Sequence, residues 1–162
     1  MLKYVETALT FSEVPYEVTL CINISNCPCH CKGCHSSYLA EDIGIILGRT
    51  ELVWLINNNI GITCVAFMGG DNSTVDINSL AKLIREVFPK LKIAWYSGRQ
   101  ELSKDIDLKN FDFIKLGPYI EELGPLNSKT TNQRFYKVMD NGNLTYELVD
   151  ITDKFWKNDK VN

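Results

Sequence analysis

Short apolar runs, each followed by a glycine or a polar turn, recur along the middle of the chain. Residues 16–24 alternate and are rich in β-branched side chains, which predicts a strand. Residues 62–68 form a short, mostly apolar run, a pattern typical of a strand covered on both faces. Residues 93–96 and 113–116 are two further short apolar runs. These four runs predict four core strands.

Segments with helical periodicity lie between the first three predicted strands. Residues 50–59 begin at Thr50, which can cap a helix, and their apolar side chains repeat at helical spacing. A clearer helix follows, with apolar residues at i, i+3, i+4 and i+7, namely Leu80, Leu83, Ile84 and Val87. Residues 99–110 predict only a short helix or irregular turns.

The ends of the chain are less regular. Residues 1–13 are ambiguous, and we interpret them as an N-terminal extension. Residues 117–133 form a loop too long for a plain connector, which favours a functional surface. Residues 135–148 predict a hairpin with Asn-Gly in its turn. Residues 150–162 are mostly polar and predict a loose tail.

Strands alternating with helices predict an α/β fold with a mainly parallel sheet. With five or six such units, we expect a partial (open) β/α barrel formed by one domain over residues 1–162. Ligands of such sheets bind at the carboxyl ends of the strands. Three candidate site elements follow predicted strands: the cysteine-rich residues 27–34, Gly69-Gly70-Asp71, and Ser97-Gly98.

Composition narrows the classes of function. The chain has 162 residues, 45% hydrophobic and 23% charged, as in ordinary globular proteins. A net charge of −3 without a basic block argues against nucleic acid as a partner. No apolar run approaches the ~20 residues that span a bilayer, and the N-terminus lacks a signal-peptide pattern. Clustered cysteines fit a reducing compartment, so we expect a cytoplasmic protein with no membrane partner.

Four of the six cysteines fall within eight residues, in Cys-Pro-Cys-His-Cys-Lys-Gly-Cys. Cys27, Cys31 and Cys34 have the spacing C-x3-C-x2-C. A [4Fe–4S] cube ligated only by protein takes four thiolates, so three leave one iron open for a small molecule. This spacing predicts a cluster with one open site.

Two other interpretations of these cysteines stay open. A structural zinc site would use Cys27, Cys29, Cys31 and Cys34, although such sites usually pair two short-spaced units from separate parts of the chain. A redox-sensing group of thiols would need no metal. Cys29 is surplus to the three-ligand pattern, and we interpret it as a loop residue that faces away from the cluster.

Gly69-Gly70-Asp71 follows the second predicted core strand. Two glycines let the backbone approach a ligand closely, and an acidic residue beyond them accepts a hydrogen bond from a ligand ammonium. The alternative is a plain strand-to-helix turn with a solvated aspartate. Lys115 lies near the end of the fourth strand, where we interpret it as a solvated lysine, with a ligand carboxylate as the alternative partner.

The cysteine motif resembles the signature of the radical S-adenosylmethionine (SAM) enzymes, and Gly69-Gly70-Asp71 is similar to their Gly-Gly-Glu motif. The resemblance implies a [4Fe–4S] cluster whose free iron is chelated by SAM. An electron from the cluster then cleaves SAM to methionine and a 5′-deoxyadenosyl radical. It assigns SAM binding to Gly69, Gly70 and Asp71, with Ser97 and His35 as further candidates.

Other segments resemble the activating proteins of anaerobic ribonucleoside-triphosphate reductase, namely residues 31–35, 117–120 and 124–134. The resemblance implies that the radical removes a hydrogen from a glycine of the reductase large subunit and leaves a glycyl radical. A flavodoxin- or ferredoxin-like carrier would supply the electron. Asn132, Gln133 and Arg134, in the most discriminating segment, would contact the reductase or order their loop.

Two other functions stay open. One is a radical SAM enzyme that acts on a small molecule, although so short a chain leaves little protein to enclose such a substrate. The other is a zinc- or iron–sulfur-binding module without catalysis. Iron content and SAM cleavage separate the enzymes from the binding module.

Overall fold

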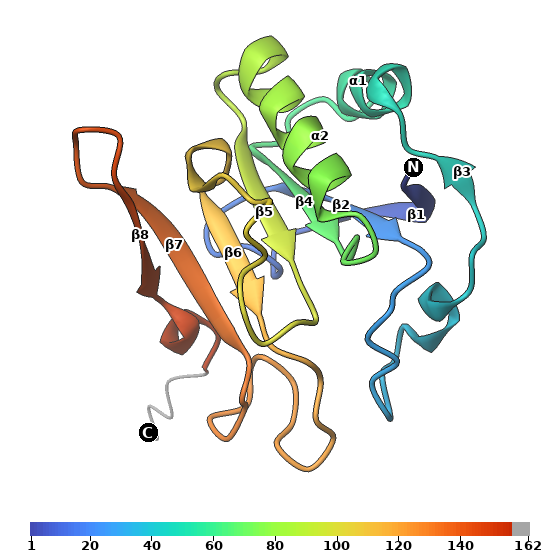
Figure 1. The fold of residues 1–162 in the computed structure, drawn as a ribbon, viewed down its shortest axis with the longest axis vertical. Helices are drawn as coiled ribbons and strands as arrows, with labels where there is room; N and C mark the ends of the chain where they lie inside the picture. The colour runs from blue at the N-terminus through green and yellow to red at the C-terminus, as the bar shows by residue number, and fades with distance from the viewer. Residues whose placement is uncertain (157–162) are drawn as a thin grey trace.

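A computed structural model describes residues 1–156 and places their strands in one eight-stranded sheet (Figure 1). The strand order is β3-β1-β2-β4-β5-β6-β7-β8. The strands are β1 (Lys3–Thr10), β2 (Thr19–Ile24), β3 (Ile45–Ile46), β4 (Cys64–Met68), β5 (Lys92–Tyr96), β6 (Phe113–Leu116), β7 (Arg134–Asp140) and β8 (Tyr146–Asp150). The helices are α1 (Arg49–Asn57) and α2 (Thr74–Val87), with three short 3-10 turns, η1 (Ser37–Ala40), η2 (Leu108–Asn110) and η3 (Thr152–Phe155).

The α/β class is confirmed, but the sheet is mixed rather than mainly parallel. The centre of the sheet is formed by four strands that run parallel to one another, β2, β4, β5 and β6. On one flank β1 pairs antiparallel with both β2 and β3, and on the other β7 pairs antiparallel with both β6 and β8. The sequence pattern predicts the parallel centre and the hairpin of β7 and β8 correctly. It misses β1, β3 and the antiparallel pairing of β7 with β6, because strand direction depends on how the connections return.

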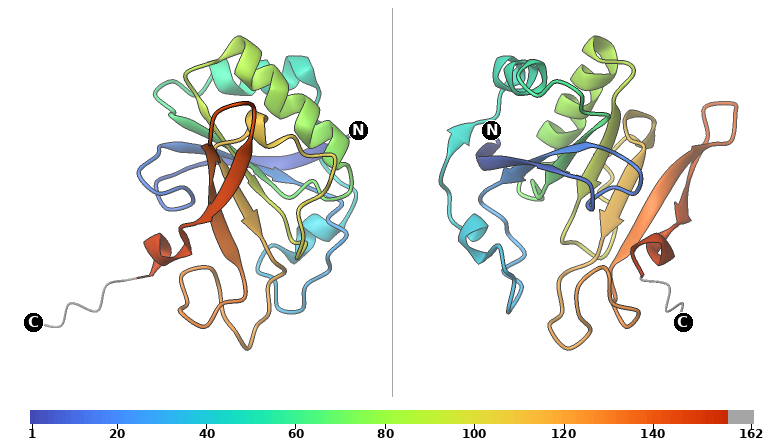
Figure 2. Two further views of the ribbon diagram at one scale, coloured as in Figure 1. Left: turned by 60° about the vertical axis from the view of Figure 1, so that its left-hand side comes forward. Right: turned by 180° about the vertical axis from the view of Figure 1, so that it is seen from behind.

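Both α-helices lie on one face of the sheet, as Figures 1 and 2 show from three sides. The predicted helices are confirmed, with α1 beginning at Arg49 after Gly48 rather than being capped by Thr50. The stripe Ile77, Leu80 and Ile84 of α2 is buried because it packs on this face. Between β5 and β6 the described chain has only η2, in line with the expected irregular segment. Within residues 1–156 no helix combines the length and apolar character needed to cross a bilayer.

The two faces of the sheet bury different side chains. The helix face carries large residues that are fully buried, including Phe67, Trp95 and Ile114. On the opposite face β2, β4 and β5 carry small ones, Cys21, Cys64, Ala66 and Ala94. This second face is covered by Val14, from the connection between β1 and β2, and by Phe135 and Phe155, whose ring centroids lie 4.9 Å apart.

Within residues 1–156, both ends are more ordered than their patterns suggest. Residues 1–13 are not an extension, because most of them form β1, and Leu2 and Tyr4 beside β2 are buried. The predicted loose tail is ordered at its start, where the Thr152 hydroxyl accepts a hydrogen bond of 2.8 Å from the Phe135 amide. Residues 157–162 lie outside the described part of the chain.

Candidate functional site

The carboxyl ends of the four parallel strands meet at one edge of the sheet, at the lower side of Figure 1. Four segments leave the sheet there: the cysteine loop (residues 27–34) after β2, residues 69–71 after β4, residues 97–99 after β5, and the long loop (residues 117–133) after β6. Parallel strands bring their carboxyl ends to the same edge, so the predicted site elements become neighbours.

Asp71 connects two of these strand ends. Its side chain is buried, and its Oδ1 accepts a 2.5 Å hydrogen bond from the Ser97 hydroxyl. Its Oδ2 accepts a 2.9 Å bond from the Gly98 amide. The Arg99 guanidinium lies 3.9 Å from Oδ1 and also donates to the Asp71 carbonyl. The structure therefore brings Asp71 and Ser97 together as the sequence suggests, but it directs the carboxylate at its own chain.

The two glycines before Asp71 allow the turn from β4 into α2. Gly69 and Gly70 have φ values of +100° and +92°, in the left-handed region that favours glycine. A Cβ on Gly70 would lie 2.5 Å from Cδ1 of Ile77, which closes this position to any side chain. The Gly69 carbonyl accepts a 2.8 Å bond from the Trp95 indole, and this bond ties the turn to β5.

Cys29 points toward Asp71. Its Sγ lies 3.9 Å from Oδ2 of Asp71, at hydrogen-bond distance for a thiol. A Cβ on Gly98 would lie 2.7 Å from the same Sγ. Burial, with a smaller contribution from the Asp71 charge, raises the pKa of the Cys29 thiol to about 12. Cys29 therefore packs as a protonated thiol against the turn after β5. That it faces away from a cluster stays a prediction.

The three predicted cluster ligands, Cys27, Cys31 and Cys34, are free and partly buried. The loop is held at its start by a 2.9 Å bond from the Cys27 amide to the Leu39 carbonyl. In residues 1–156 no three His, Cys, Asp or Glu side chains are arranged to hold a single metal ion. A cube makes a different demand, because each thiolate binds its own iron. Three free thiols on one short loop at this edge fit such a donor set chemically.

Lys115 on β6 is buried, contrary to the interpretation of a solvated strand end. Its Nζ donates hydrogen bonds of 2.6 Å to the Gly117 carbonyl and 3.3 Å to the Ser97 carbonyl. Desolvation lowers the pKa of this ammonium to about 8, although the charge of the Asp71 carboxylate opposes the shift. The sequence Phe-Ile-Lys-Leu predicts a strand, but it does not show whether the ammonium of the lysine is buried. The strand pattern alone therefore did not identify this lysine as a site residue.

The remaining candidate residues are His35 on the cysteine-loop side, and Asn132, Gln133 and Arg134 where the long loop meets β7. His35 is exposed. Asn132 donates a 3.0 Å bond to the Pro118 carbonyl, and Gln133 is buried. Arg134 donates to the carbonyls of Thr131 and Gln133, each at 2.8 Å. These contacts join the two ends of the long loop and connect it to β7.

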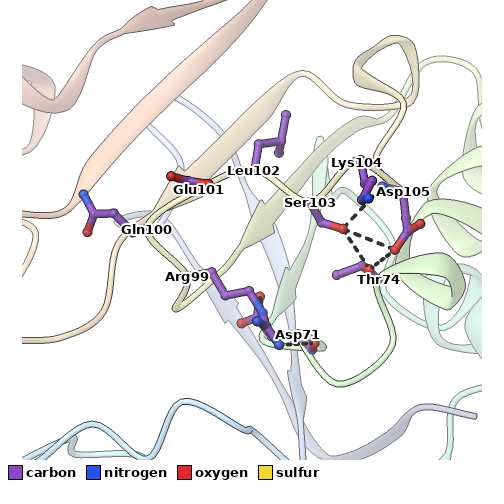
Figure 3. Close-up of a pocket in the computed structure, with 9 residues that line it drawn as sticks. All are labelled: Asp71, Thr74, Arg99, Gln100, Glu101, Leu102, Ser103, Lys104 and Asp105. Atoms are coloured by element: carbon purple, nitrogen blue, oxygen red, sulfur yellow. Dashed lines mark hydrogen bonds and ion pairs between the residues drawn. The ribbon is translucent and has the colours of Figure 1, made fainter.

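An open hollow of about 730 Å³ lies beside Asp71, between the start of α2 and the segment after β5 (Figure 3). It is lined by Asp71, Thr74 and residues 99–105. Thr74 donates a 2.7 Å hydrogen bond to Asp105 across the hollow, and the close-up places Arg99 beside Asp71. Arg99 was missed from the sequence; the available signal was its position directly after Ser97-Gly98.

Comparisons of the chain with protein-family models, curated proteins and solved structures found no match. The function is therefore argued from the site itself. Its distinguishing features are three free thiols on one loop, a glycine turn with a buried carboxylate, and a buried ammonium, all at the carboxyl edge of the parallel strands.

Proposed function

We propose that this protein is a radical SAM activase that installs a glycyl radical on the large subunit of an anaerobic ribonucleoside-triphosphate reductase. The observation that best supports the proposal is the position of the C-x3-C-x2-C loop directly after β2, beside the Gly69-Gly70-Asp71 turn that follows β4. The finer description of the fold as an open β/α barrel belongs to the same proposal.

In this proposal Cys27, Cys31 and Cys34 each hold one iron of a [4Fe–4S] cluster, whose fourth iron takes SAM. The cluster supplies the electron that cleaves SAM to methionine and a 5′-deoxyadenosyl radical, which abstracts the glycine hydrogen. Gly69 and Gly70 form, with their left-handed backbone, the turn against which the methionine part of SAM would lie. Asp71 accepts hydrogen bonds from Ser97 and Gly98, so it holds the turn after β5 that forms one wall of the site. The ligand ammonium would lie beside this carboxylate.

The protein partner would dock at the same edge of the sheet. The long loop stands beside the cysteine loop, since a Cβ on Gly33 would lie 3.1 Å from the carboxyl carbon of Glu121. Asn132, Gln133 and Arg134 would then act by holding this loop in shape for the reductase. A flavodoxin- or ferredoxin-like protein in the cytoplasm would supply the electron.

Anaerobic reconstitution with iron and sulfide tests the cluster. We expect about four irons per chain, and reductive cleavage of SAM to 5′-deoxyadenosine. Cys27→Ser, Cys31→Ser and Cys34→Ser should each lose the iron and the cleavage. Cys29→Ser is the matched control from the same loop, and it should keep about four irons, since Cys29 contacts Asp71 and Gly98.

The same preparations separate the alternatives. A glycyl radical signal that appears only with SAM, reductant and the reductase large subunit supports the activase. Cleavage of SAM without any glycyl radical would favour an enzyme acting on a small molecule. A colourless chain with one zinc would favour a binding module and contradict the proposal.

A further inference from the structure

Lys115 carries a buried charge that lacks an anionic partner in direct contact. It lies on β6 opposite Phe135 of β7 and beside Tyr96 of β5, so its side chain leaves the sheet on the face away from the helices. Its side chain is only 7% exposed, and the hydrogen bonds shown for it go to two backbone carbonyls. In the described part of the chain, no carboxylate lies within ion-pair distance of its Nζ.

A buried ammonium without a counter-ion is costly, so its retention calls for an electrostatic reason. Ser97, whose carbonyl accepts one of its hydrogen bonds, also donates its hydroxyl to the Asp71 carboxylate at the end of β4, and the Cys29 sulfur of the cysteine loop lies 3.9 Å from that carboxylate. All of them belong to the edge where the parallel strands end. Its two carbonyl partners, Ser97 and Gly117, follow β5 and β6, and they hold the ammonium at this edge.

We propose that Lys115 is a positioning residue whose buried positive charge faces the cysteine loop and raises the reduction potential of the iron–sulfur cluster held there. The inference rests on the proposed function, because it needs a cluster on Cys27, Cys31 and Cys34. Reduction adds one electron to a group that already carries thiolate charge. A fixed cation in surroundings of low dielectric constant therefore stabilises the reduced form more than the oxidised form.

The test is a potentiometric titration of reconstituted protein, followed by electron paramagnetic resonance and carried out without SAM. Lys115→Met removes the charge at similar volume, and Lys115→Gln removes it while keeping an N–H donor for the Gly117 carbonyl. We expect both variants to hold about four irons and to lower the equilibrium constant for one-electron reduction about tenfold, equal to a potential about 59 mV more negative.

Lys137→Met is the matched control. Lys137 lies on β7 opposite Phe113, on the same face as Lys115 but exposed and further from the cysteine loop. The same loss of charge there should leave the potential as in the wild type. Omitting SAM makes the shift report on the lysine and the cluster, rather than on a lysine that holds the SAM carboxylate.

Each outcome decides the question. A potential unchanged in both Lys115 variants would overturn the inference. Loss of iron from both Lys115 variants, with iron retained in Lys137→Met, would also overturn it, because Lys115 would then be needed only for the structure of the cluster site. A wild-type chain that binds no iron would instead refute the proposed function, and the inference would fall with it.

Discussion

The contacts of individual residues determine the role of the Asp71 carboxylate in the Gly-Gly-Asp turn. The Asp71 carboxylate accepts from Ser97 and Gly98, and Cys29 fills the space against Gly98. The sequence places Asp71 and Ser97 at the ends of neighbouring strands. It does not show that they bond to each other, because that depends on the φ and ψ angles of two turns 26 residues apart.

Gly98→Ala tests the inward position of Cys29. The added Cβ would meet Sγ at 2.7 Å, so we expect a loss of about 1–3 kcal/mol in the free energy of unfolding. Adding Cys29→Ala removes the sulfur and should recover most of that loss. Urea unfolding of the two single variants and the double variant measures the coupling. Equal costs of Gly98→Ala with and without the sulfur would contradict this packing.

Lys115 predicts a pH-dependent stability. Its pKa is about 8 in the folded chain against 10.5 for the ordinary group, so between these values the unfolded chain binds more protons. The free energy of unfolding should therefore rise with pH in this window, by up to about 3 kcal/mol at about 1.36 kcal/mol per pKa unit. Below pH 8 both states are protonated and this rise is absent.

The measurement is the difference in unfolding free energy between the wild type and Lys115→Met, determined at intervals from pH 7 to pH 10. Subtracting the variant removes the titration of other groups. The difference between the wild type and Lys137→Met should stay constant over the same range, because Lys137 is exposed. A difference for Lys115→Met that is equally flat would show that the lysine is solvated.

At the scale of elements, β1 shows where local pattern fails. Residues 3–10 lack a clean alternation, and only their antiparallel pairing with β2 makes them a strand. The short β3 escapes prediction for the same reason, since its two residues pair with Lys3 and Tyr4. Strands β4, β5 and β6 are predictable because both of their faces are covered, which makes most of their residues apolar; Lys115 in β6 is an exception.

Two leucines at either end of β1 test its part in the fold. Leu2→Ala removes a side chain that is 1% exposed, and we expect it to cost about 2–4 kcal/mol of unfolding free energy. Leu9→Ala removes the same atoms from a side chain that is 52% exposed and should cost less than about 1 kcal/mol. Chemical denaturation of both variants gives the comparison. Similar small costs would mean that residues 1–13 are an extension after all.

At the scale of the whole molecule, the proposed function depends on segments that meet although the chain separates them widely. The cysteine loop and the long loop approach each other where Gly33 lies against Glu121. Asn132 closes the long loop by bonding to the Pro118 carbonyl, 14 residues earlier. The docking face of the proposed activase is therefore built by tertiary contacts, and the conformation of residues 117–133 is part of it.

Asn132→Ala should loosen this loop without unfolding the sheet. Losing one hydrogen bond to the Pro118 carbonyl is expected to cost about 1 kcal/mol, which corresponds to a severalfold faster cleavage by trypsin after Lys129. Asn127→Ala, at an exposed position in the same loop, is the control and should be cleaved at the wild-type rate. Equal rates for both variants would contradict the role given to Asn132.

The sequence by itself determined the central strands, both helices, and the order in which the cysteine loop, the Gly-Gly-Asp turn and the Ser-Gly turn follow their strands. These features depend on short-range periodicity and on direct succession along the chain. Tertiary structure decided the antiparallel pairing of β1 with β2 and of β7 with β6, the position of the Cys29 thiol beside Asp71, the hydrogen bonds of the Asp71 carboxylate and the burial of Lys115. Each of these depends on residues distant in sequence, whose meeting is set by how the strands pair and how the loops return.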